Sequence, residues 1–254
     1  MAITVHSARE IDAMRRAGAV AAATLHAVCQ RVEAGISTAD IDAWVREDTA
    51  ERDATPSQLG FRGFPAAVCT SVGSVVCHGI PSKGVVLRDG DTINVDVTSC
   101  FEGFHGDTSR SLLIGDVDAD TRRVTEAAEA AMWAGIEAVR PGARLGDLGA
   151  AIAACAATFG CTVVREFGGH GIGRRMHMPP HVEHVGRPGS GPRLKPGMTF
   201  TIEPMLTLHP VALELDDDGW TCRTADGSPS AQFEHTVAVT ANGVEVLTLP
   251  PGDD

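Results

Sequence analysis

The sequence predicts an α+β fold built from two related halves, each with two helices followed by two strands. Three observations support this prediction. Two helical patterns open the chain, and a similar pair recurs in its second half. Two separate segments recur 107 positions later, and acidic residues stand at corresponding strand ends of the two halves. One long repeat indicates two pseudo-symmetric halves, because a solenoid would need several shorter repeats.

The helices are predicted from their start signals. Ser7 and Glu10 form a capping-box pattern, in which each side chain can bond to the backbone N–H of the other residue. Ser37 and Asp40 mark the start of a second, shorter helix. The four expected helices span roughly 7–32, 37–53, 120–139 and 145–159.

The repeat is strongest in two short segments. VEAG at 32–35 aligns with VRPG, and LRDGDTINVD at 87–96 aligns with LKPGMTFTIE, each 107 positions later. The second pair ends on an acid in both copies. We therefore predict one catalytic domain over 1–254, internally duplicated, with halves of about 7–115 and 120–249.

Four carboxylates and one imidazole lie in otherwise apolar strands or in a glycine-rich loop. They are Asp96, Asp107, His170, Glu203 and Glu234. Like charges a few Å apart cannot all stay ionised, whereas two divalent cations would balance four carboxylates in formal charge. An oxygen-rich ligand set with one imidazole is typical of sites for Mn, Fe, Co or Zn, and it is unlike a structural zinc site, whose ligands are mainly cysteine sulfurs. The sequence therefore predicts a hydrolase that binds two divalent metal ions.

The spacing of the acids predicts part of the site geometry. Asp96 and Asp107 flank a turn near the sequence FEG. A two-residue loop at FE would place the two acids directly opposite each other, and a shift by one residue would make them diagonal neighbours on the same face. Glu203 and Glu234 are 31 residues apart, so we expect an excursion between their strands.

Bulk properties exclude several classes of protein. A net charge of −12 argues against nucleic-acid and anionic-membrane partners. The seven cysteines form no C-x-x-C pair, and the N-terminus lacks an apolar signal region, so we expect a cytoplasmic protein with reduced thiols. No apolar stretch approaches 18 residues, which disfavours a membrane span. We expect a monomer.

The motifs VCHGIP, NVDVTSCFEGFHGDTSR, GGHGIG, LKPGMTFTIEPM and SAQFEHTVAVT stand in an order that resembles type I methionine aminopeptidases. The resemblance covers nearly the whole chain and indicates the short bacterial form within the pita-bread metallopeptidase superfamily. It implies two pseudo-symmetric α-α-β-β halves around a curved antiparallel sheet. The implied activity removes the initiator methionine from nascent proteins and peptides with a small second residue, through attack of metal-activated water. The implied partners are nascent N-termini, with transient ribosome contact.

The resemblance also implies a role for each candidate metal ligand. Asp96 would bind one metal ion, while His170 and Glu203 would bind mainly the other. Asp107 and Glu234 would bridge both ions.

Catalytic and pocket residues are implied in the same way. Glu203 would also move the proton of the attacking water, while His78 and His177 would contact the substrate and stabilise the transition state. The chain departs from the family in having no tyrosine, and Gln58 lies near a usually small or thiol position. The implied methionine pocket consists of Phe61, Phe64, Cys69, His78, Met176 and Trp220.

Three alternatives remain open at the level of sequence. Aminopeptidase P and prolidase belong to the same superfamily but usually carry an extra N-terminal domain, whereas here only about 60 residues precede the pocket segment. A type II methionine aminopeptidase would carry a long insertion in its second half, and none of sufficient length appears in this sequence. Binding proteins with this fold typically lose metal ligands, and all five are present here.

Overall fold

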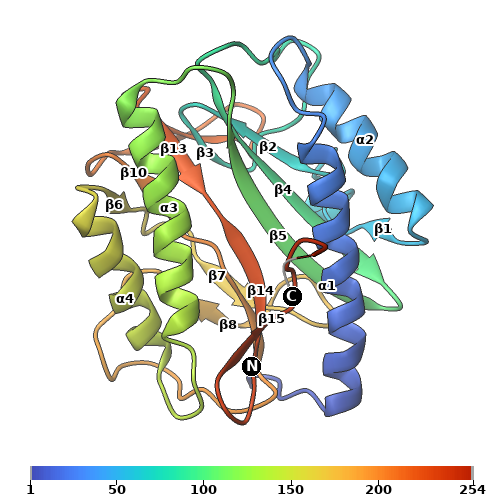
Figure 1. Ribbon diagram of the computed structural model, residues 1–254, viewed down its shortest axis with the longest axis vertical. Helices are drawn as coiled ribbons and strands as arrows, with labels where there is room; N and C mark the ends of the chain where they lie inside the picture. Colours follow the sequence, from blue (N-terminus) through green and yellow to red (C-terminus); the bar gives the residue numbers. More distant parts are fainter. Residues whose placement is uncertain (1, 253–254) are drawn as a thin grey trace.

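The computed structural model describes residues 2–252, and its helices form two pairs. The first pair is α1 (Ala8–Cys29) with α2 (Thr38–Glu51), and the second is α3 (Ala119–Glu137) with α4 (Leu145–Thr158). In the view of Figure 1, one pair lies to the left and the other to the right of the long central strands. The four predicted helices are therefore confirmed, with α1 ending a few residues earlier than expected.

Both capping boxes are present at the predicted helix starts. The Ser7 N–H donates to the Glu10 carboxylate at 3.0 Å, and the Glu10 N–H donates back to the Ser7 hydroxyl. Ser37 and Asp40 make the same pair of bonds at the start of α2. A cap of this kind typically stabilises a protein by about 1 kcal/mol, so local sequence fixes where these helices begin.

The main sheet is antiparallel, with strand order β1-β4-β5-β14-β9-β7-β8; β2 also pairs with β4, and β15 with β14. Two small sheets, β13-β10-β6 and β11-β12-β3, flank it. The bounds of the main-sheet strands are β1 Thr55–Pro56, β2 Cys69–Val72, β4 Thr92–Phe101, β5 Phe104–Leu113, β7 Gly169–Gly171, β8 Met178–Val182, β9 Thr199–Ile202, β14 Glu234–Val239 and β15 Val244–Val246. Those of the small sheets are β3 Val75–Cys77, β6 Thr162–Val163, β10 Met205–Thr207, β11 Leu213–Leu215, β12 Cys222–Thr224 and β13 Ser230–Gln232.

Equivalent contacts recur in the two halves with the spacing of the sequence repeat. The Gly35 N–H donates to the Leu87 carbonyl at 2.8 Å, and the Gly142 N–H donates to the Leu194 carbonyl at 3.0 Å. Each bond ties the loop between two helices to the segment that leads into a central strand. The predicted class, α+β with two pseudo-symmetric α-α-β-β halves around an antiparallel sheet, is confirmed.

The helices cover one face of the sheet and leave the other face for polar groups. Val95 and Val97 of β4 are fully buried in one cluster with Leu25 and Val28 of α1. Because side chains alternate along a strand, the intervening Asp96 projects from the opposite face. The same alternation applies across the sheet, so the helix-free face carries the candidate site.

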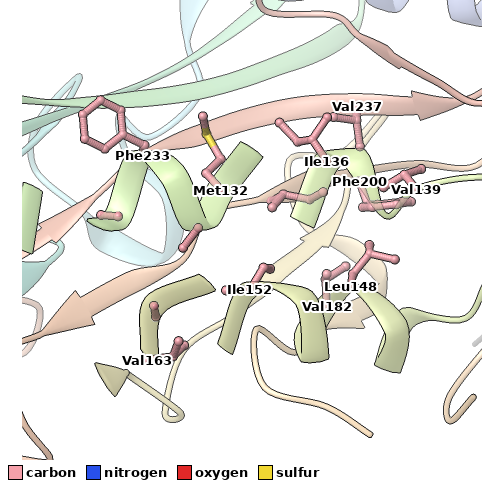
Figure 2. Close-up of a cluster of buried hydrophobic side chains, with 14 of the residues drawn as sticks. Met132, Ile136, Val139, Leu148, Ile152, Val163, Val182, Phe200, Phe233 and Val237 are labelled. Atoms are coloured by element: carbon pink, nitrogen blue, oxygen red, sulfur yellow. The ribbon is translucent and has the colours of Figure 1, made fainter. Parts of the chain in front are cut away.

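Figure 2 shows the corresponding core of the second half, where α3 and α4 pack against β9 and β14. Large apolar side chains from all four elements interdigitate there. They include Met132, Ile136, Leu148, Ile152, Phe200 and Val237. This packing sets the position of the two strands that carry or precede the glutamates.

The β4–β5 hairpin adopts the second of the two registers considered from the sequence. Asp107 pairs with Thr98, and Asp96 pairs with Ser109, so the two acids are diagonal neighbours on one face. The two-residue turn consists of Glu102 and Gly103, both with positive φ (49° and 76°). Turns of this type match the twist of the strands they join. The other register, in which Asp96 and Asp107 would lie directly opposite each other, is wrong.

The excursion expected between Glu203 and Glu234 is also present. After β9, the chain forms β10, β11, β12 and β13 before it returns as β14. These strands build both small sheets together with β3 and β6 from earlier in the chain. The excursion brings Trp220 to the site.

Gly106 provides a test of how closely helix and sheet approach. A Cβ atom on Gly106 would lie 2.6 Å from the Ala17 carbonyl oxygen and from the Gly18 Cα of α1. Both are backbone atoms, so we expect Gly106→Ala to lower the free energy of unfolding by about 1–3 kcal/mol. Gly243→Ala is the matched control, because its Cβ would meet no described atom within 4 Å. Urea unfolding of both variants measures the difference, and equal stabilities would contradict this packing.

Candidate metal centre and substrate cavity

A cavity of about 370 Å³ opens on the helix-free face of the main sheet. Every side chain that the sequence predicted for the site lines it, so the structure brings the whole predicted set together. These residues are Phe61, Phe64, Cys69, His78, Asp96, Asp107, His170, Met176, His177, Glu203, Trp220 and Glu234.

The five candidate ligands come from five neighbouring strands. Asp96 lies on β4, Asp107 on β5, Glu234 at the start of β14, Glu203 directly after β9 and His170 on β7. These strands are adjacent in the order β4-β5-β14-β9-β7. The ligands therefore form an arc across the sheet, although they lie far apart in the sequence.

The distances among these side chains suit a metal ion. His170 Nε2 lies 3.6 Å from Asp107 Oδ2 and 3.6 Å from Glu203 Oε1. Ligand atoms of Asp107, His170 and Glu234 all lie within 4.8 Å of one another. Metal bonds from such ligands measure about 2.0–2.2 Å, so a small contraction of this group would enclose one ion.

The raised pKa values of the buried acids also indicate a metal site. Burial raises the pKa of Asp107 to about 7. Burial, followed by the negative charges of Asp107, Glu203 and Asp96, raises the pKa of Glu234 well above its usual value. Glu234 Oε1 is buried and has no hydrogen-bond partner among the described residues. An unpaired buried carboxylate oxygen is costly, and a divalent cation would satisfy it, so the residues present fit a metal.

The orientation of His170 would suit a metal ligand. Its Nδ1 lies 3.1 Å from the Gly171 carbonyl oxygen, which can only accept, so Nδ1 carries the proton and the Nε2 lone pair faces the acids. Burial lowers the pKa of His170 to about 3, which keeps the ring neutral. Gly169 permits the close strand pairing that places the ring, because a Cβ there would lie 2.3 Å from the Thr201 carbonyl oxygen.

Outer contacts that sequence reasoning missed support the acids. Thr98 Oγ1 donates to Asp107 Oδ1 at 2.6 Å, and Thr201 Oγ1 donates to Glu203 Oε1 at 2.6 Å. Thr201 lies two residues from Glu203 on the same strand face, and Thr98 lies opposite Asp107 in the hairpin. Period-two spacing around each predicted acid was the available signal for both threonines.

A buried histidine, His184, bonds to the backbone of Glu203. The Glu203 N–H donates to His184 Nε2 at 3.1 Å. Burial lowers the pKa of His184 to about 3, so the ring stays neutral and can accept this bond. No local motif in the sequence indicates His184, because the bond depends on the packing of distant segments.

The apolar part of the cavity is a compact aromatic slot. Phe64 packs edge-on against Trp220 with ring centroids 5.1 Å apart, and Phe61 lies 4.9 Å from His177. Burial and the nearby carboxylates raise the pKa of Cys69 well above its usual value, so its thiol is neutral. An apolar slot with a neutral thiol suits an apolar side chain.

His78 and His177 flank the slot and the acids. His78 is half-buried, has a left-handed backbone (φ 58°) and stands edge-on to Phe167 and Trp220. His177 is exposed at the rim, with its ring centroid 4.1 Å from that of His170. Several further lining residues had no sequence signal that singled them out. They are Arg62, Glu166, Phe167, His181 and Met205.

Among residues 2–252, no helix combines the length and apolar character needed to cross a bilayer.

Comparison with known proteins identifies the family. The signature of metallopeptidase family M24 matches residues 12–241. Methionine aminopeptidase A of Synechocystis sp. is 47% identical over 247 residues, which cover 97% of this chain and 98% of the relative. The crystal structure of methionine aminopeptidase from Rickettsia prowazekii has a TM-score of 0.95 at 43% identity, covering 98% of this chain and 100% of that one.

A more distant structure shows how far the fold extends. The prolidase from Pyrococcus horikoshii has a TM-score of 0.76 at 20% identity and covers 98% of this chain but only 64% of the prolidase. This likeness concerns the fold alone, and together with the closer structure it confirms the predicted pita-bread arrangement. The match at 47% identity over nearly the full length of both chains identifies the branch of the family, which the fold alone does not. The chain belongs to metallopeptidase family M24 and, within it, to the methionine aminopeptidases.

Proposed function

We propose that this protein removes the N-terminal initiator methionine from nascent proteins and peptides whose second residue is small. The observation that carries the proposal is the arc of four carboxylates and His170 at the floor of a cavity whose other wall is an apolar slot. The arc supplies a metal-dependent hydrolytic centre, and the slot supplies a place for an unbranched thioether side chain.

We propose that two divalent ions occupy the centre, drawn from Mn, Fe, Co and Zn. Asp96 would hold one ion, His170 and Glu203 mainly the other, and Asp107 and Glu234 would bridge the two. Two cations would cancel the charge of the four acids, which explains how carboxylates with pKa values raised by burial can all ionise in the loaded protein.

When bound, the ions supply Lewis acidity that lowers the pKa of water and polarises the peptide carbonyl. Glu203 takes the proton of the attacking water and passes it to the leaving amine. His78 and His177 contact the substrate beside the scissile bond and donate hydrogen bonds to the developing negative charge. The slot orients the methionine side chain so that the first peptide bond lies over the acids.

The proposal extends to the setting of the reaction. The substrates are nascent N-termini, so we propose a cytoplasmic enzyme that acts as a monomer and contacts the ribosome only transiently. We also propose that residues 1–254 form one catalytic domain whose halves, about 7–115 and 120–249, arose by internal duplication. Recurrence of the Gly35–Leu87 bond as Gly142–Leu194 supports the duplication.

The experiment that tests the function uses metal-free protein with two peptides. We expect release of free methionine from Met-Ala-Ser when Co, Mn, Fe or Zn is added, and no cleavage of an Ala-Pro peptide. Cleavage of only the Ala-Pro peptide would move the chain to the proline-directed branch of the superfamily. Stoichiometric metal binding without cleavage of either peptide would indicate a binding protein instead.

A further inference from the structure

Gln58 is a buried polar residue, 6% exposed, for which the reaction described above has no role. It lies between β1 and the short 3₁₀ turn Phe61–Gly63. Its Nε2 lies 2.9 Å from the main-chain oxygen of Asp96 and 3.2 Å from Asp96 Oδ1. Its Oε1 accepts the N–H of Thr98 at 3.4 Å. The side chain thus bonds both to a candidate metal ligand and to the strand that carries it.

The orientation of the Gln58 carboxamide is dictated by its partners. Both Asp96 atoms are oxygens that accept hydrogen bonds, so the amino group must face them and the carbonyl must face the Thr98 N–H. Nε2 also lies 3.8 Å from Cys69 Sγ. The two N–H groups of Nε2 thus face three acceptors, two oxygens of Asp96 and the more distant Cys69 sulfur, and together with the Thr98 N–H these partners hold the side chain in one position.

The location of Gln58 explains why a side chain reaches this point. Strands β1 and β2 both pair with the edge of β4 that β5 leaves open. Gln58 fills the stretch between them, where it bonds to the backbone as a neighbouring strand would. These bonds to the backbone of β4 are all that a purely structural role of Gln58 would require. The additional bond to Asp96 Oδ1 has no part in strand pairing, and it restricts rotation of the carboxylate.

The other acids with a similar donor show what this bond does. Thr98 donates to Asp107, and Thr201 donates to Glu203. Each threonine occupies one lone pair of a carboxylate oxygen, and Glu203 also accepts a longer bond from Gln232 Nε2 at 3.4 Å. Gln58 serves Asp96 in the same way but comes from outside the strand, so it can be replaced without changing the sheet residues themselves.

We propose that Gln58 is a positioning residue that fixes the carboxylate of Asp96 and thereby strengthens binding of the metal ion held by Asp96. This inference rests on the proposed two-metal centre. Loss of an outer hydrogen-bond partner of a metal ligand typically costs about 10–100-fold in metal affinity. The ion held by His170 and Glu203 has its own outer partners and should not respond.

The test is a calorimetric titration of metal-free protein with Mn²⁺, which resolves the affinities of the two sites. We expect Gln58→Met, which has a similar length but no donor, to weaken one site by roughly 10–100-fold and to leave the other unchanged. Gln58→Asn withdraws the carboxamide by one methylene and should weaken the same site. Urea unfolding of each metal-free variant establishes that it is folded.

Ser57→Ala is the matched control. Ser57 precedes Gln58 in the same turn, and its hydroxyl bonds to His105 Nδ1 at 2.8 Å instead of to an acid. We expect this variant to keep wild-type affinity at both sites. Unchanged affinities in folded Gln58→Met and Gln58→Asn, or an equal loss in Ser57→Ala, would overturn the role of Gln58. A wild-type protein that binds no Mn²⁺ would instead contradict the proposed metal centre itself.

Discussion

Replacing Asp107 with alanine is expected to abolish methionine release and to strip divalent metal from the protein. Asp107 lies between Asp96 and His170 in the arc and is bonded to Thr98, which directs it into the cavity. A bridging ligand contacts both ions, so its loss should cost more than the roughly 10–100-fold in affinity that an outer partner costs. Metal content after gel filtration and release of methionine from Met-Ala-Ser are the measurements.

Two further variants sharpen this prediction. Asp217→Ala removes an exposed acid outside the cavity and should keep both metal and activity. Asp107→Asn keeps the shape of the side chain and an acceptor for Thr98, yet it removes one negative charge and should also lose activity. Substantial activity of Asp107→Ala with normal metal content would rule out the bridging role.

Removing the metal is expected to make stability depend steeply on pH above neutrality. Burial raises the pKa of Asp107 to about 7, and burial with mutual repulsion raises the pKa values of Asp96, Glu203 and Glu234. A carboxyl group with a raised pKa binds its proton more tightly in the folded state than in the unfolded state. Its contribution to stability is therefore lost as pH rises through the folded-state pKa.

The pH window follows from the other titrating groups. Burial lowers the pKa values of His170 and His184 to about 3, so these groups oppose the carboxylates below pH 6.5, where they would gain protons only on unfolding. Above pH 7 the histidines are neutral in both states. Between pH 7 and 8.5 the free energy of unfolding should fall by on the order of 1.4 kcal/mol per pH unit for each proton released.

Thermal unfolding after chelation, repeated at several pH values with and without Mn²⁺, tests this expectation. Metal should stabilise the protein far more at pH 8.5 than at pH 6, because protons and metal compete for the same oxygens. Metal-free Asp107→Asn should be more stable than metal-free wild type at pH 8.5. A flat pH profile from 7 to 8.5 for the metal-free wild type would contradict the buried cluster of acids.

Local patterns in the sequence were sufficient to predict much of the fold. The capping boxes at Ser7 and Ser37 involve residues three positions apart, so pattern alone located both helix starts. The hairpin register could not be chosen in this way. Two loops were compatible with the FEG turn, and the chain uses the one that places Glu102 at a positive φ, which non-glycine residues rarely adopt.

The candidate site was predictable where acids occur in unusual strand contexts and not where its support comes from distant segments. Asp96 and Glu203 stood out because each ends a repeated segment. The contacts of Gln58 with Asp96 and of His184 with Glu203 could not be predicted, because they join residues 38 and 19 positions apart. Such contacts follow from the order of strands in the sheet, which a single sequence does not reveal.

Anomalous diffraction from crystals grown with Zn²⁺, measured on both sides of the zinc absorption edge, tests the two-metal centre most directly. We predict two anomalous peaks in the cavity, both within about 2.0–2.2 Å of oxygens of Asp107 and Glu234. One peak should also contact Asp96, and the other His170. A single peak, or peaks remote from Asp107 and Glu234, would contradict the two-metal centre.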